Sequence, residues 1–180
     1  MNLEKRKVCG GRMSDPLFHL VFSGAVGTAG QSGIEFISHD PLINCKSAGG
    51  KIAYKAGQFI FWGVIGGLGT DSDHLVSVVM KGLPVTYNNL ALYGGKWGHV
   101  PLLLACLAVF LCTGILFLKT QFRHGTKLPT SGRHFALSAG LLFSVMAHLS
   151  SDYLFYCIRG ICRLEPLGSD AVKMLIMLFR

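Results

Sequence analysis

The sequence predicts an all-α integral membrane protein, a helical bundle of four to five apolar helices that forms a single domain over residues 1–180. Apolar residues make up 51% of the chain and charged residues only 14%, whereas a soluble domain carries about 25% charged residues. The stretch Val100–Leu118 has no charged side chain over nineteen residues, and a helix that crosses a bilayer needs about 20 apolar residues. These two observations favour a membrane-embedded chain.

The other apolar segments follow the chain in order. Pro16–Thr28 is expected to be the first helix, because proline suits a first helical turn. His19 lies inside this apolar stretch, which favours an uncleaved membrane helix over a cleaved signal peptide. The second expected segment is Ala56–Gly69, and both it and the first are short for a full crossing of the membrane. After Val100–Leu118, the remaining expected segments are His134–Tyr156 and a short interfacial segment at Asp170–Phe179.

Cationic residues lie between the apolar segments and not in one dense stripe. Seventeen Lys and Arg against nine Asp and Glu give a net charge of +8. The segment Lys119–Arg133 contains cations and no acid, so the positive-inside tendency predicts that it is cytoplasmic. We expect membrane lipids as partners and no specific nucleic-acid binding. The six cysteines form no Cys-x-x-Cys pair, which argues against a disulfide framework and a cysteine zinc site.

Histidines and aspartates at segment ends are the candidate chemistry. Asp71, Asp73 and His74 follow the second apolar segment within four positions. Two such close carboxylates repel each other, and a divalent cation would remove that repulsion. His148 and Asp152 are four residues apart, which places both on one face of a helix.

These groups are expected to meet at one end of the bundle. The segments Val100–Leu118 and His134–Tyr156 are joined by the fifteen residues Lys119–Arg133, so we expect them to form an antiparallel hairpin. At a rise of 1.5 Å per residue, His99, His148 and Asp152 then lie about 30, 22 and 28 Å from this connection. The aspartates after segment two can reach the same end. His19 is a further candidate, because ionisable residues at membrane depth mark function or a partnered interior site.

Mixed aspartate and histidine ligation suits a divalent metal, with zinc expected and manganese or iron as alternatives. Such an ion would lower the pKa of a bound water towards ~7 and polarise a phosphoryl or acyl oxygen. The hypothesis is a membrane-bound hydrolase. A non-catalytic membrane accessory protein is the first alternative, and a haem protein with axial ligands from His19, His99 or His148 is the second. The predicted metal ligands are His19, Asp71, Asp73, His74, His99, His148 and Asp152, with Asp71, Asp73 and Asp152 also as catalytic candidates.

Four short stretches resemble the YdjM-type membrane-bound metal-dependent hydrolases. "GGLGTDSDH" resembles that family's G-x-L-x-P-D-x-D-H segment, and "AHLSSDYL" resembles its H-x-x-x-D helix. "KWGHVPLLL" resembles its H-R-G-x-T-H-S segment, and His19 matches its N-terminal histidine. The resemblance implies a helical fold akin to the zinc-dependent phospholipase C group. It also implies hydrolysis of a phosphoester, with lipids among the candidate substrates.

The chain departs from this family pattern at several positions. Thr70 stands where the family has proline, and Gly94 and Gly95 replace the first histidine and the arginine of the third motif. That motif is reduced to His99, so the chain is either a divergent active member or one that has lost activity.

The expected location is the inner (cytoplasmic) membrane of a bacterium.

Overall fold

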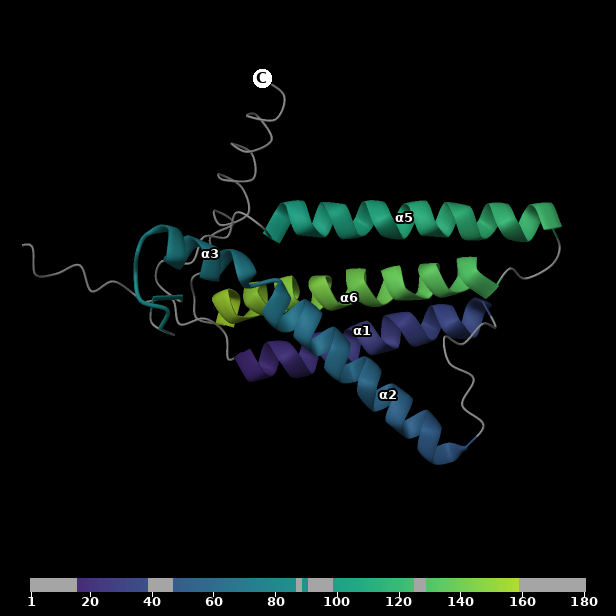
Figure 1. The fold of residues 1–180 in the computed structure, drawn as a ribbon, viewed down its shortest axis with the longest axis horizontal. Helices are drawn as coiled ribbons and strands as arrows, with labels where there is room; N and C mark the ends of the chain where they lie inside the picture. The colour runs from purple at the N-terminus through teal and green to yellow at the C-terminus, as the bar shows by residue number, and fades with distance from the viewer. Residues whose placement is uncertain (1–15, 39–46, 87–88, 91–98, 125–128, 159–180) are drawn as a thin grey trace, which may run out of the picture.

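The computed structural model describes residues 16–38, 47–86, 89–90, 99–124 and 129–158, and these are helical or irregular, with no strand among them. The fold is therefore all-helical, as predicted. Figure 1 shows α1 (Pro16–Ser38), α5 (His99–His124) and α6 (Pro129–Ile158) running side by side, while α2 (Ala48–Trp62) crosses them at an angle. The predicted segment at 170–179 lies outside the described residues.

Helices α5 and α6 form the predicted antiparallel hairpin (Figure 1), but both are longer than their apolar runs. We expected a connection of about fifteen residues, and the structure corrects this: α5 continues to His124 and α6 begins at Pro129. Basic residues that we expected in the connection, such as Lys119, Arg123 and Arg133, therefore lie within the two helices. Cys106 packs against Leu142 and Val145 at the core of this pair.

Two helices are long and apolar enough to cross a membrane. The segment His99–Phe122 has a mean hydropathy of 2.6 and the segment Ser131–Leu154 has 1.2. Helices α1 and α2 do not meet this test: α1 contains polar side chains such as Gln31 and Glu35, and α2 has only 15 residues. The structure thus confirms that the described chain is helical and that two of its helices could cross a membrane. It does not confirm four to five apolar helices.

Helix α2 begins at a capped end and finishes in an irregular turn. Ser47 precedes α2, and its hydroxyl accepts a hydrogen bond from the Gly50 amide at 3.0 Å, a standard stabilising cap. At the other end, the glycine-rich π-helix η1 (Gly63–Gly69) continues α2. A π-turn adds a residue per turn and redirects the chain, so η1 sets where Asp71 enters the bundle.

A buried polar network joins α1 to α2 far from the predicted site. The Glu35 carboxylate accepts hydrogen bonds from Tyr54 at 2.7 Å, Gln58 at 3.0 Å and Lys55 at 3.1 Å. Gln31 in turn accepts from the Trp62 indole at 2.7 Å. Each buried polar group shown here has a partner, which is what stable burial of a carboxylate requires. This network explains why α1 extends ten residues beyond the predicted end at Thr28.

Glycines allow close packing of α1 on its neighbours. A Cβ atom at Gly27 would lie 2.7 Å from Trp62 Cβ and 2.9 Å from Ser144 Cβ, whereas one at Gly33 would meet nothing within 4 Å. Small residues at helix contacts let backbones approach closely. The glycines of α1 therefore have different roles on its two sides.

This difference predicts opposite effects of one substitution. Gly27→Ala should lower the stability of the folded protein by about 1–3 kcal/mol, because the added methyl overpacks the contact. Gly33→Ala should leave stability unchanged or raise it by up to about 1 kcal/mol, since alanine is the better helix former. Thermal unfolding in detergent, followed by circular dichroism, measures both. Equal midpoints for the two variants would contradict the packing described.

Candidate metal centre

All seven histidines and aspartates singled out in the sequence lie at one end of the bundle. His19 comes from the first turn of α1, and His99 is the first residue of α5. Asp71, Asp73 and His74 stand where η1 gives way to α3 (Ser72–Met80). The last two residues, His148 and Asp152, are one turn apart in α6, and Figure 1 shows these helix ends together.

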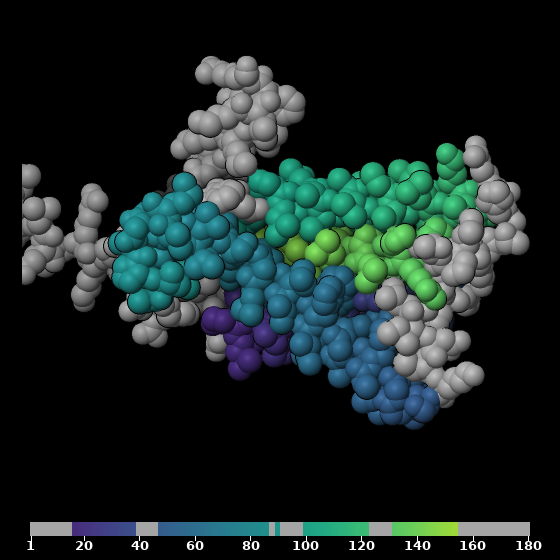
Figure 2. Space-filling model, viewed as in Figure 1, coloured from purple at the N-terminus to yellow at the C-terminus, as the bar shows by residue number. Residues whose placement is uncertain are grey.

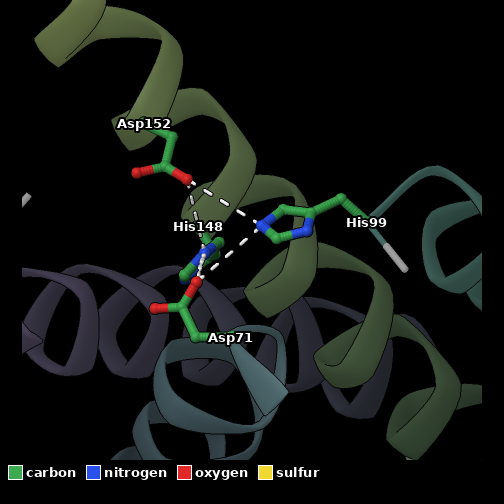
Figure 3. A group of neighbouring side chains, drawn as sticks. All are labelled: Asp71, His99, His148 and Asp152. Carbon is green, nitrogen blue, oxygen red and sulfur yellow. Dashed lines mark ion pairs between the residues drawn. The ribbon is translucent and has the colours of Figure 1, made fainter. Parts of the chain in front are cut away.

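Four of these side chains direct one ligand atom each towards a common point (Figure 3). The nitrogen Nε2 of His148 lies 3.2 Å from Asp71 Oδ1 and 3.6 Å from Asp152 Oδ2. His99 Nε2 lies 3.8 Å from Asp71 Oδ1 and 4.0 Å from Asp152 Oδ2. The four atoms are all within 4.8 Å of one another. They come from three separate parts of the chain.

These separations suit ligands around a small cation. Metal–ligand distances of about 2.0–2.1 Å in a tetrahedral site place neighbouring ligand atoms about 3.4 Å apart. The observed separations of 3.2 to 4.0 Å bracket that value. Two carboxylates and two imidazoles also match donor sets for zinc, manganese or iron. The residues present therefore fit a divalent metal.

Burial makes the arrangement costly unless something satisfies its polar atoms. The side chain of His148 is 0% exposed and that of His99 is 6% exposed. Within the described part of the chain, the buried atoms His74 Nε2, His99 Nε2 and His148 Nε2 have no hydrogen-bond partner. Buried polar atoms are nearly always satisfied, and an unsatisfied one calls for an explanation such as an ion. Here three such nitrogens are gathered at one place.

The charge state of Asp71 favours a cation. Burial by itself raises the pKa of this carboxyl, but the nearby imidazoles, His148 first and His74 next, lower it further than burial raises it. The pKa of Asp71 therefore lies below its usual range, and the group is an anion at neutral pH. A buried carboxylate anion beside several imidazole nitrogens is a ready ligand for a divalent metal.

A second group shares His99 with the first. Asp73, His74 and His99 also place ligand atoms within 4.8 Å of one another. His99 Nδ1 lies 2.9 Å from Asp73 Oδ2, and His74 Nε2 lies 3.9 Å from Asp73 Oδ1. His74 Nε2 is also 3.9 Å from Asp71 Oδ1. The two groups are thus adjacent parts of one cluster.

His19 lies beside the cluster, outside both groups of ligand atoms. Its ring stacks on that of His148 with centroids 4.1 Å apart. Its Nε2 atom is 3.2 Å from Asp152 Oδ1, and its Nδ1 atom is 2.8 Å from the hydroxyl of Ser151. Ser151 was not among the residues predicted from the sequence. A serine between His148 and Asp152 gives no signal by itself, because its partner is 132 residues away in the chain.

No protein-family model matches the chain, and no curated protein or solved structure is significantly similar to it. The resemblance to the YdjM-type hydrolases therefore stays a prediction based on the residues quoted for it. Gly94 and Gly95, which depart from that pattern, lie outside the described residues.

Proposed function

We propose that this protein is a membrane-embedded, metal-dependent hydrolase whose substrate is a phosphoester. The observation that supports the proposal is the convergence of Asp71, His99, His148 and Asp152 on one point at the end of the bundle. The network around Glu35, by contrast, satisfies its buried polar groups. Among the described residues, every buried side-chain nitrogen without a hydrogen-bond partner belongs to a histidine of the cluster.

Membrane embedding is supported by the exposure of α5. Only 11% of its apolar window is buried inside the molecule, whereas 56% of the α6 window is buried. Figure 2 shows α5 along one edge of the molecule. A core helix of a soluble protein would be mostly covered, and large exposed apolar surfaces mark interaction sites. Lipid tails are the cover we infer for this surface; location in a bacterial inner membrane stays a prediction.

A charge placed on this surface tests the inferred bilayer. Leu111, 52% exposed near the middle of α5, should not tolerate arginine, because a charge at the bilayer centre costs about 2.5–3.5 kcal/mol. Phe122, 87% exposed near the end of α5, should tolerate arginine, since the longer side chain can reach the interface. The measurement is the yield of membrane-integrated protein after carbonate extraction. Equal yields would argue for a water-exposed α5, where both substitutions are near neutral.

The proposed chemistry gives Asp71, His148 and Asp152 distinct tasks. A bound divalent metal supplies Lewis acidity, which activates water and polarises a phosphoryl oxygen. Asp71 and His148 would hold it from two sides of the bundle, and Asp152 lies where one oxygen faces His148 and the other faces His19. That position suits a carboxylate that orients or deprotonates an attacking water. The cluster lies at a helix end, near the expected level of lipid head groups, so lipid phosphoesters are among the candidate substrates.

The two alternatives make different demands on the same residues. A haem would need a porphyrin plane between its axial imidazoles, and His19 and His148 instead stack directly at 4.1 Å. That contact is why we place the hydrolase ahead of the haem protein. A non-catalytic accessory protein would use the same cluster without turnover.

Elemental analysis combined with a hydrolysis assay tests the proposal. Protein purified in mild detergent is expected to contain about one zinc, manganese or iron per chain and to cleave a chromogenic phosphodiester. A chelator should abolish the cleavage, and the removed metal should restore it. Stoichiometric metal without cleavage would favour the accessory protein, and a Soret band would favour haem. Protein without metal or haem would reject both metal-based readings.

A further inference from the structure

Three histidines of the cluster have their Nδ1 atoms engaged on the side away from the ligand point. The Nδ1 atom of His74 lies 3.2 Å from the carbonyl oxygen of Leu90. A carbonyl can only accept, so the imidazole donates from Nδ1–H in this contact. A neutral imidazole has one N–H, and the Nε2 atom of His74 is then the one with the free lone pair.

The same reasoning fixes His19 through Ser151. The Ser151 hydroxyl donates its single hydrogen to the carbonyl oxygen of His148 at 2.7 Å. Its oxygen must therefore accept from His19, whose Nδ1 atom is 2.8 Å away. Neutral His19 then has its Nε2 lone pair directed at Asp152 Oδ1, 3.2 Å away. Two lone pairs at this distance repel each other unless a cation or a proton lies between them.

Asp73 fixes His99 in the same way. The separation of 2.9 Å between Asp73 Oδ2 and His99 Nδ1 is an ordinary N–H···O hydrogen bond. It is shorter than the separation of about 3.4 Å expected for two ligands of one tetrahedral ion. An ionised carboxylate only accepts, so His99 donates from Nδ1–H and directs its Nε2 lone pair towards Asp71 and Asp152.

We propose that Asp73 and Ser151 are positioning residues, which hold His99 and His19 with Nδ1 protonated, so that the Nε2 lone pair of His99 faces the four-atom group and the Nε2 lone pair of His19 faces Asp152 at its edge. This inference rests on the proposed function and refines it, because it moves Asp73 from the predicted ligands to the supporting residues. Metal-binding histidines donate their other N–H to a carboxylate, a backbone carbonyl or a water that sets their orientation, and loss of such partners typically costs about 10–100-fold in metal affinity or activity.

Metal affinity in matched variants of the full chain tests this division. With Zn²⁺ competed against a chromophoric chelator, Asp73→Ala and Ser151→Ala should keep one ion per chain and bind it roughly 10–100-fold more weakly. Asp73→Asn and Ser151→Thr, which keep an acceptor oxygen, should recover much of the loss. Ser144→Ala is the control, since Ser144 is buried in the same helix and donates to Leu141 at 2.9 Å. Complete loss of the ion in Asp73→Asn would overturn the proposal, because it would make Asp73 a ligand.

A second measurement reads the tautomers without any metal. Long-range ¹H–¹⁵N spectra of the side chains in metal-free protein should show His19 and His99 protonated at Nδ1, and the Ser151→Ala spectrum should change at His19 alone. Protonation at Nε2 in the wild type would overturn the inference even if the protein binds metal. If the wild type binds no metal and still shows Nδ1 protonation, the proposed function fails and the positioning roles stand.

Discussion

Asp71→Asn is expected to abolish stoichiometric metal binding while the helices stay folded. Asp71 Oδ1 makes the shortest contact of the four-atom group, 3.2 Å from His148 Nε2, and it also faces His99. The substitution keeps the size of the side chain but removes the negative charge that offsets a divalent cation. The affinity should fall by more than the 10–100-fold typical of supporting residues. Elemental analysis of the detergent-purified protein, beside its circular dichroism spectrum, measures both parts of this expectation.

The matched control for this substitution is Glu35→Gln. Glu35 is also a buried carboxylate, paired with Lys55 at 3.1 Å, but it belongs to the network at the other end of α1. Its replacement should weaken the α1–α2 contact, because the buried network loses the charged acceptor shared by Tyr54, Gln58 and Lys55, and should leave the metal content unchanged. Metal loss in Glu35→Gln alone would show that the ion binds elsewhere in the bundle.

The helices could be predicted where the sequence is uniformly apolar. The run Val100–Leu118 identifies α5 because its composition alone suffices. Composition does not predict the full length of α1, because this helix continues through the polar residues Gln31 and Glu35. These polar side chains interrupt the apolar pattern, but partners on α2 satisfy them. Which partners are present depends on how two distant segments cross, and one sequence does not contain that information in a local pattern.

The gathering of the candidate residues could also be expected from the chain. An antiparallel hairpin of known rise brings His99 level with His148 and Asp152, and the structure places these three together. The finer arrangement could not be predicted. The π-helix before Asp71 and the contact of Ser151 with His19 are set by packing, and neither has a sequence signature.

His148→Gln is expected to lower the hydrolysis of a chromogenic phosphodiester by about 10³-fold or more. His148 contacts both carboxylates of the four-atom group and is fully buried, so its loss removes one ligand that no solvent molecule can readily replace. A metal contributes several kcal/mol of transition-state stabilisation, and each 1.36 kcal/mol is a factor of ten in rate. The measurement is kcat in detergent or nanodiscs with excess Zn²⁺, which separates a damaged site from a merely empty one.

His134→Gln is the matched control, because it changes the same residue type on the same helix. His134 lies fourteen positions earlier in α6, about 21 Å along the axis, and its side chain is exposed. It should keep both full metal content and full activity. If the two variants lost activity equally, the effect would come from α6 as a whole and not from the cluster. If His148→Gln kept wild-type kcat, the ion would not be catalytic, and the accessory-protein alternative would account better for a metal held at the end of this bundle.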